Sequence, residues 1–246
     1  MKKINLTFLS FTGAVIIFTG LLLFFNIHTS VSEVVNKTEE DVMREFCVLG
    51  EKITEFPFYV YKDGRSGENK FFPTGNMGDY ENYQLYMYSK DNPYSSPECI
   101  KIVYKAAKNK KSGWAGLYWQ YPVNNWGNIG RAYDLTLATK LTFYARGESG
   151  GEVINKFQVG GIDGRYRDSG VVSIGPVTLS KDWKQYTIDL KNIDNSIIIS
   201  EEDKQCWPFM APLSRIIGGF CWATDLRVNY GKDVIFYLDE IKFEKD

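Results

Sequence analysis

Histidine is nearly absent from this chain: its 246 residues include only His28. A Ser-His-Asp or Cys-His nucleophile system needs an imidazole as its base, and His28 lies at the end of an apolar N-terminal segment. The remainder of the sequence therefore lacks the side chain for that chemistry. The same absence excludes zinc sites built from histidine. Chemistry that depends on paired carboxylates stays open.

An excess of charge of one sign is also missing. The chain has 29 Lys and Arg against 30 Asp and Glu, which gives a net charge of −1. A nucleic-acid surface shows a clustered basic excess, so we expect no nucleic-acid partner. One basic run holds Lys105, Lys108, Lys110 and Lys111 between two strand-like segments, and it indicates a solvated hairpin tip.

Cysteine is scarce, with Cys47, Cys99, Cys206 and Cys221 and no C-x-x-C pair. A zinc knuckle is therefore not expected. In an exterior compartment these four residues allow three complete disulfide pairings, and the sequence does not choose among them. Cys221 lies in "GGFCWAT", which indicates a buried strand and a buried free thiol.

The N-terminal segment, residues 1–30, begins with Lys2 and Lys3 and continues with an uncharged apolar run over residues 6–25. As a helix this run spans about 30 Å, enough to cross a bilayer, and the lysines place the rest of the chain outside. The run is long for a signal peptide, so we favour an uncleaved transmembrane anchor. The alternative is a cleaved signal, with Ser30 and Ser32 at the cut. The predicted location is therefore membrane-anchored with an exterior domain, or secreted.

Residues 31–54 are predicted to form a helical stem. Thr38 is a candidate N-cap, and Val42, Phe46 and Leu49 recur at helical spacing. From residue 55 to residue 246 the pattern changes to that of an all-β domain.

This second region holds ten short runs rich in aromatic and β-branched residues, separated by Gly, Asn, Asp, Ser or Pro. They are "EFPFYVYKD", "YQLYMYS", "ECIKIVYKAA", "GWAGLYWQYP", "TKLTFYARG", "INKFQVGGI", "VVSIGPVTL", "WKQYTIDL", "RIIGGFCWA" and "VIFYLDEIKFE". Several alternate, so that Leu141, Phe143 and Ala145 point one way and the residues between them the other. The pattern predicts an antiparallel two-sheet jelly-roll β-sandwich.

Residues 113–130, "GWAGLYWQYPVNNWGNIG", combine aromatic rings with amides. Sugars offer an apolar C–H face and a rim of hydroxyls, so their sites pair aromatic platforms with amide, carboxylate and guanidinium groups. This predicts a glycan site with platforms at Tyr118, Trp119 and Trp126. The predicted hydrogen-bonding groups are Gln120, Asn125, Arg131 and Arg146. The alternative is that Trp114 and Trp119 lie in the core of the sandwich.

Several phrases follow one another as in a known group of domains. "WAGLYWQYPVNNWG", "ATKLTFYARGESGGE", "FQVGGI", "VTLSKDWKQYTIDL", "IIGGFCW" and "FYLDEIKFE" resemble the strands of galactose-binding-like jelly-roll domains, among them many carbohydrate-binding modules. The resemblance covers residues 55–245. It implies a non-catalytic β-sandwich that binds a polysaccharide or other glycan.

The resemblance also implies a structural calcium ion, which in that fold class often bridges the first and last strands. Asp239 in "FYLDEIKFE" matches the usual carboxylate, and Asp63 or Glu68 is its expected partner. The alternative is that Asp239 is hydrogen-bonded at a β-bulge. No organic cofactor is expected.

Two other functions remain as alternatives. One is an envelope scaffold or interaction domain without a sugar site. The other is a carboxylate-dependent glycan hydrolase or lyase, which needs two carboxylates on opposite sides of the scissile bond. Glu148 and Glu152 are candidates, but they flank a Gly-rich turn and more simply indicate a solvated hairpin end.

Overall fold

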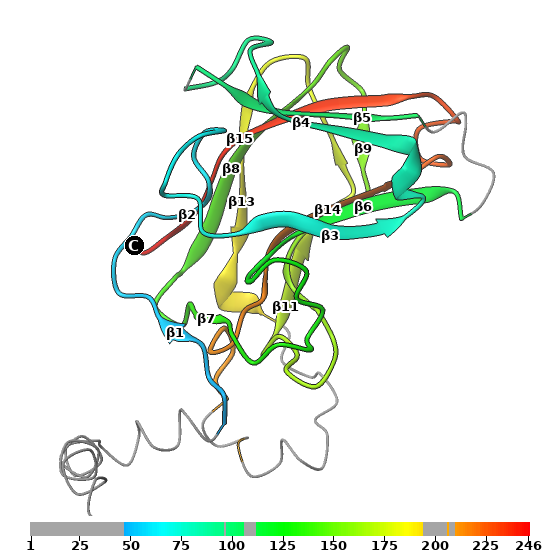
Figure 1. Ribbon diagram of the computed structural model, residues 1–246. Helices are drawn as coiled ribbons and strands as arrows, with labels where there is room; N and C mark the ends of the chain where they lie inside the picture. The colour runs from blue at the N-terminus through cyan, green and yellow to red at the C-terminus, as the bar shows by residue number, and fades with distance from the viewer. Residues whose placement is uncertain (1–46, 96, 106–111, 194–205, 207–209) are drawn as a thin grey trace, which may run out of the picture. The chain divides into compact units, whose positions relative to one another are not determined.

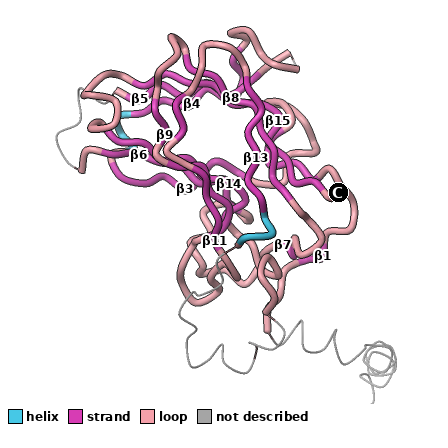
Figure 2. The backbone as a smooth tube through the Cα atoms, turned by 180° about the vertical axis from the view of Figure 1, so that it is seen from behind, coloured by secondary structure: helices cyan, strands magenta, loops and turns pink. Residues whose placement is uncertain are grey.

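Two antiparallel β-sheets packed against each other form the framework of the described chain (Figure 1). The computed structural model describes residues 47–95, 97–105, 112–193, 206 and 210–246. Helical structure in these residues is confined to two short 3₁₀ turns, η2 (Tyr80–Asn82) and η4 (Leu190–Asn192) (Figure 2). The predicted all-β sandwich is therefore confirmed.

The larger sheet has six strands, and its long central strand is β15 (Val234–Glu244). Along the sheet the strands follow the order β13 (Lys184–Asp189), β8 (Lys140–Gly147), β15, β5 (Cys99–Tyr104) and β4 (Tyr83–Ser89), and β2 (Phe58–Tyr61) also pairs with β15. The smaller sheet has the order β11 (Val171–Ile174), β10 (Lys156–Gly160), β14 (Gly218–Asp225), β6 (Trp114–Gln120) and β3 (Phe72–Gly78). Two short ladders pair β1 (Glu51–Lys52) with β7 (Tyr133–Asp134) and β12 (Val177–Thr178) with β9 (Val153–Ile154).

All ten runs predicted to be strands contain one, but β3 was not predicted. Its sequence, "FPTGNMG", holds a proline and three residues that favour turns. The segment gives no strand signal, because Pro cannot donate to a ladder and Gly has no side chain to pack. The strand lies at the edge of its sheet, and its register with β6 shifts between Pro73 and Gly75. An edge position with a bulge is where such residues are tolerated.

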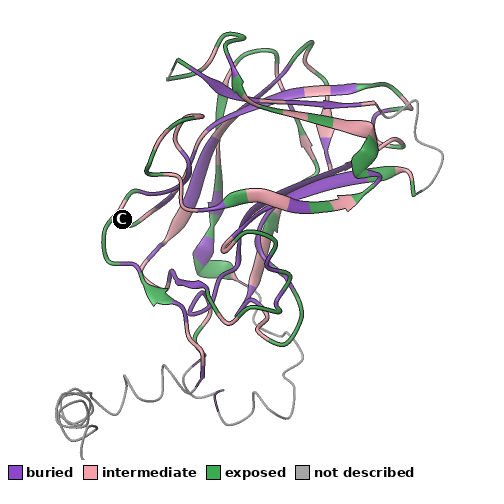
Figure 3. Cartoon of the chain, viewed as in Figure 1, coloured by how far each residue is buried: buried purple, intermediate pink, exposed green. Residues whose placement is uncertain are grey.

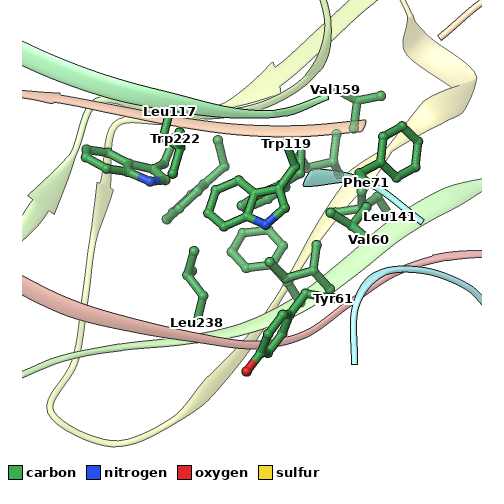
Figure 4. Close-up of a cluster of buried hydrophobic side chains, with 14 of the residues drawn as sticks. Val60, Tyr61, Phe71, Leu117, Trp119, Leu141, Val159, Trp222 and Leu238 are labelled. Carbon is green, nitrogen blue, oxygen red and sulfur yellow. The ribbon is translucent and has the colours of Figure 1, made fainter. Parts of the chain in front are cut away.

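The core lies between the two sheets and is built largely from aromatic rings (Figure 4). Trp119 of β6 and Trp222 of β14 are both fully buried there. The predicted alternation in β8 is confirmed, because Leu141, Phe143 and Ala145 face this core. Burial of these side chains supplies most of the favourable free energy of such a fold.

The two sheets differ in how their outer faces are covered, as the burial pattern shows (Figure 3). Almost every residue of β6 and β14 is buried, on both faces of each strand. The outward side of these strands is covered by a second apolar cluster that includes Tyr118, Ala132 and Ile162. By contrast, every second residue of β4 is exposed. An accessible surface on a sheet is therefore to be sought on the six-stranded one.

The N-terminal predictions fall mainly outside the described residues. Residues 1–30 and 31–46 are not described, and residues 47–54 contain a turn and the short strand β1. Within the described part of the chain, no helix has the length and apolar character needed to span a bilayer.

A disulfide joins Cys47 to Cys206, which are 159 residues apart in sequence. Cys99 and Cys221 are free and buried, which confirms the buried thiol predicted for Cys221. Next to this bridge, the buried Arg215 donates from Nε to the carbonyl of Arg167 at 2.7 Å and from Nη1 to the carbonyl of Cys47 at 3.3 Å. The start of the described chain is thus fastened to the domain by a covalent bond and by a buried guanidinium.

Asp168, beside Arg215, organises the loop that follows β10. Its fully buried carboxylate accepts hydrogen bonds from the backbone N–H groups of Ile162 and Ile217. Burial raises the pKa of this carboxyl to about 7, although these N–H groups oppose the shift. Burial likewise raises the pKa of Asp239 to about 6.

Because the pKa values of these two carboxyls are raised in the folded chain, we expect the stability of the fold to fall as the pH rises towards neutrality. A carboxyl whose pKa is higher in the folded chain stabilises it fully below the unfolded value, 3.8, and that contribution is lost as the pH rises through the folded value. We expect Tm to fall between about pH 4 and pH 7, which lies between the unfolded and folded pKa values, and Asp168→Asn to flatten that fall. Thermal unfolding across this range measures both.

The matched control is Asp163→Asn in the same loop, because the Asp163 side chain is 84% exposed. It should keep the slope of the wild-type profile. A wild-type Tm that rises or stays constant across the range would contradict the prediction.

Candidate functional site

The aromatic stretch over residues 113–130 is divided between the core and a covering loop. Trp119 has no exposed surface and packs in the core, so a ligand at the surface does not reach it. Gln120 is also fully buried, and its Nε2 donates to the carbonyl of Asn125 at 2.9 Å. Tyr118 is 5% exposed, and its hydroxyl donates to the carbonyl of Gly160 at 3.0 Å. These three side chains hold β6 to its surroundings.

Asn125 organises the loop that follows β6. Its Nδ2 donates to the carbonyls of Ile129 and Arg131, at 2.9 and 3.2 Å. Its Oδ1 accepts from the N–H groups of Gly127 and Ile129, both at 3.1 Å. Since both ends of the amide are engaged and the residue is fully buried, Asn125 positions the loop and is not presented to a ligand.

Trp126 and Arg131 are the members of the predicted set that lie at the surface of this loop. Trp126 is 42% exposed, and its ring meets that of Tyr118 edge-on, with the centroids 6.1 Å apart. The exposed Arg131 donates from Nη2 to the Tyr121 hydroxyl at 2.9 Å, and its guanidinium lies 5.5 Å from the centroid of that ring. Trp126 is thus partly tucked against the sheet and partly displayed.

Arg146, the last of the predicted residues, lies elsewhere. It is on β8, in the six-stranded sheet, with its side chain on the face directed away from the core. Its guanidinium lies 3.7 Å from the centroid of Tyr237 on the neighbouring β15, and 5.4 Å from that of Trp183. The predicted residues therefore do not form one site, because Arg146 and the loop after β6 belong to different sheets.

The outer face around Arg146 holds a row of aromatic and cationic side chains, of which only Arg146 was predicted from the sequence. The strand registers place Tyr86, Lys101, Tyr237 and Arg146 in one row across β4, β5, β15 and β8. The ammonium of Lys101 lies 5.3 Å from the centroid of Tyr237. Cations over aromatic faces are mutually attractive, so this row is held in place by its own contacts.

A groove of about 650 Å³ lies on this face beside β4. Its lining includes Tyr86 and Tyr88 of β4, Lys101 and Val103 of β5, and Ile235 of β15. Tyr86 is 46% exposed and Tyr88 57%. The groove therefore offers exposed aromatic faces next to polar groups, which the buried members of the predicted set do not.

Two of the three lysines that line the groove, Lys101 and Lys105, are paired with carboxylates. Lys101 Nζ lies 2.6 Å from a carboxylate oxygen of Asp91, and Lys105 Nζ lies 2.9 Å from one of Asp233. The hydrogen bond between Lys101 and Asp91 lowers the pKa of the Asp91 carboxyl and raises the pKa of the Lys101 ammonium. Both groups therefore remain ionised at neutral pH and present hydrogen-bond donors and acceptors with little net charge.

The first part of the loop from β4 to β5, residues 90–95, crosses the same face (Figure 1). Arg146 Nη2 donates to the carbonyl of Asp91 at 2.7 Å, and Trp183 Nε1 to that of Asn92 at 2.8 Å. The ring of Tyr94 stacks on that of Tyr144 of β8, with centroids 3.5 Å apart. The loop is thus attached to β8 and to Trp183 before β13, at the edge of the sheet opposite β4. We call residues 90–95 the crossing loop.

Asp239 lies beneath the crossing loop. Its Oδ2 accepts from the N–H groups of Tyr94 and Ser95, at 3.0 and 3.4 Å, and its Oδ1 from that of Glu240 at 2.9 Å. The register of β15 with β8 shifts between Asp239 and Lys242. Asp239 is therefore hydrogen-bonded at a β-bulge, as the alternative prediction stated.

Asp63, the predicted calcium partner, accepts from the N–H of Arg65 at 2.8 Å. Both oxygens of Asp239 are thus engaged with backbone donors. Among the described residues, no group of three or more His, Cys, Asp or Glu side chains is placed to hold a metal ion. The calcium site at Asp239 and Asp63 stays a prediction, and we derive no chemistry from the ion.

The carboxylates considered for catalysis lie at the end of a hairpin. Glu148 Oε2 accepts from the Tyr237 hydroxyl at 2.7 Å, and Glu152 Oε1 accepts from the N–H of Ser149 at 2.8 Å. Each therefore has a structural partner within or beside the turn.

No protein-family model matches the chain, and no curated protein matches it in sequence. Solved structures do resemble it. A crystal structure of a family 30 carbohydrate-binding module is 14% identical, with a TM-score of 0.51 over 78% of this chain and 89% of that chain.

Two others are modules of cellulosomal cellulases of Clostridium thermocellum, each 14% identical to this chain. The family 30 module of Cel9D-Cel44B has a TM-score of 0.49 over 78% of this chain and 99% of its own. The family 11 module of Lic26A-Cel5E has a TM-score of 0.46 over 76% and 94%. The crystal structure with the TM-score of 0.51 shows that the described domain has the β-sandwich fold of a carbohydrate-binding module, as the sequence predicted.

Proposed function

We propose that this protein binds a carbohydrate chain, without catalysis, in the groove beside β4. The observation that carries the proposal is the exposure of Tyr86 and Tyr88 next to the ion pair of Lys101 and Asp91. Aromatic faces take the C–H side of a sugar ring, while donors and acceptors beside them take the hydroxyls. The fold shared with a carbohydrate-binding module supports the same function.

The pairing of the charges favours a ligand whose polar groups are mainly hydroxyls. An acidic polymer would have to compete with Asp91 for Lys101 and with Asp233 for Lys105. A hydroxyl can instead donate to the carboxylate and accept from the ammonium of the same pair without separating them. Binding should therefore depend little on salt, which screens interactions between net charges.

The location of the domain is part of the proposal. The apolar run over residues 6–25 would hold the domain outside a membrane, or would direct its secretion. A disulfide between Cys47 and Cys206 supports an oxidising exterior compartment. A structural calcium ion at Asp239 also remains a proposal, which the binding measurement below includes.

The test is binding of the full chain to a panel of neutral polysaccharides (β-glucan, mannan and xylan) and acidic polyuronates. It is run at low and high salt, with added calcium and with a chelator. We expect a neutral glycan to bind and Tyr86→Ala to weaken that binding by at least about fivefold, since loss of an aromatic stacking partner costs on the order of 1–3 kcal/mol. Isothermal titration calorimetry measures the affinity.

Tyr230→Ala is the matched control, because Tyr230 is 88% exposed and does not line the groove. It should bind as tightly as the wild type. Trp126→Ala tests the predicted loop in the same way, and a loss of binding there but not in Tyr86→Ala would move the site to that loop. Failure of the well-folded wild type to bind any member of the panel would favour a scaffold role.

A further inference from the structure

The groove beside β4 is closed at one end. Its lining follows β4 from Gln84 and continues through Ser89 to Lys90 and Asp91, which belong to the crossing loop. Along β5 and the residue that follows it, the groove runs from Lys101 to Lys105, a span of about 13 Å. The groove is therefore elongated in the strand direction, and the crossing loop stands at the Asp91 end.

The crossing loop makes contacts with every strand that it passes. A carboxylate oxygen of Asp91 lies 2.6 Å from Nζ of Lys101 on β5. The backbone carbonyl of Asp91 accepts from Nη2 of Arg146 on β8 at 2.7 Å. Tyr94 and Ser95 donate to Asp239 of β15. Ser95 Oγ also donates to Glu240 at 3.0 Å. These contacts fix the loop against the sheet as a wall.

The burial of the residues beneath the wall agrees with this arrangement. Arg146 and Tyr237 lie on the outer face, yet Arg146 is only 7% exposed and Tyr237 only 1%. Tyr86, in the same row but on β4, is 46% exposed. This contrast runs across the strands, so it places the crossing loop over β15 and β8, at the side of the open strip over β4 and β5. Along the strands, the next residue of β5 on the outward face after Lys101 is Cys99, which is fully buried and does not line the groove.

We propose that the groove binds the end of a glycan chain and not its interior, an inference that rests on the proposed function. A polymer lying along β4 cannot continue past Asp91, because the crossing loop occupies its path. The terminal sugar then meets the Asp91 carboxylate and the Lys101 ammonium, which can exchange hydrogen bonds with the hydroxyls that only a chain end exposes. Tyr86 and Tyr88 supply the stacking faces behind it.

The consequence is a fixed ratio of protein to chain. An unbranched polymer has one end of each kind, so a site for one kind of end takes one protein molecule per chain, whatever the chain length. A site for the chain interior takes more protein as the chain grows. The two modes are therefore separated by stoichiometry and not by affinity alone.

The experiment uses the full-length protein and unbranched fragments of graded length from each neutral polysaccharide of the panel, from tetrasaccharides to the intact linear polymer. Sedimentation and calorimetry give the number of protein molecules bound per chain. We expect one at every length. A number that rises with length would overturn the chain-end inference and leave the proposed function standing, whereas no binding to any fragment or polymer would overturn both.

Two further experiments identify which end of the glycan chain is bound and test the role of the crossing loop. Borohydride reduction alters only the reducing end, so lost binding assigns the site to that end, and retained binding at one protein per chain assigns it to the other. A variant with residues 92–95 replaced by two glycines keeps Asp91 for binding and shortens the crossing loop, and its stoichiometry should rise with chain length. A folded variant of this kind that still binds one per chain would contradict the role given to the crossing loop.

Discussion

Replacing Trp119 by alanine should lower the free energy of unfolding by about 3–5 kcal/mol, the cost of emptying a large buried site. Trp119 has no exposed surface, and its ring packs edge-on against Phe220 of β14, with the centroids 5.7 Å apart. The substitution removes contacts on every side of the indole, and the rigid sheets around it cannot close the cavity. Chemical denaturation of the wild type and the variant measures the difference.

Trp126→Ala is the matched control, since it removes the same side chain from the same stretch. Trp126 is 42% exposed and touches the sheet through one edge, so we expect a loss of about 1 kcal/mol or less. Equal losses in the two variants would show that the loop after β6 is as much a part of the core as the strand. A small loss at Trp119 would contradict its placement between the sheets.

Removing the disulfide by Cys47→Ser and Cys206→Ser together should cost about 4–5 kcal/mol, at the upper end of the range for such bonds. The bridge closes a loop of 159 residues, and the entropy that a cross-link removes from the unfolded chain grows with loop length. The measurement is the denaturation midpoint of the double variant and of the reduced wild type. The two should agree.

Either single substitution should cost as much as the double, because one missing thiol already abolishes the bond. Cys221→Ala is the control for loss of a buried sulfur without loss of a cross-link, and its cost should be clearly smaller. A double variant as stable as the wild type would mean that the hydrogen bonds of Arg215 to residues 47 and 167 hold the segment without the bridge.

The fold could be predicted from the sequence because its strands are marked locally. Alternation in "KLTFYAR" correctly placed Phe143 and Arg146 on opposite faces of the strand, and the structure shows that Phe143 faces the core. The edge strand β3 could not be found this way, since Pro73 and Gly75 remove the propensity signal and their tolerance depends on a bulge against β6. Edge position is a property of the sheet and not of the segment.

The candidate site was harder to predict, because aromatic residues mark cores and binding faces alike. Trp119 and Tyr118 alternate on β6, but both faces of that strand are covered, one by the opposing sheet and the other by loops. The run "YQLYMYS" carried the better signal. Its alternating tyrosines lie on an edge strand whose outer side is open, and that opening is decided by where the crossing loop begins.

The strand order has a consequence for how the chain is made. β14 joins β10 to β6, β15 joins β8 to β5, and both are among the last segments of this sequence to be synthesised. Before they emerge from the ribosome, the earlier strands of the two sheets can form only separate pairs, such as β3 with β6 and β4 with β5. Isolated pairs are marginal in water, so neither sheet can close during most of translation. The nascent polypeptide therefore stays unfolded, with its aromatic segments accessible to chaperones, until residues 218–244 arrive and complete both layers.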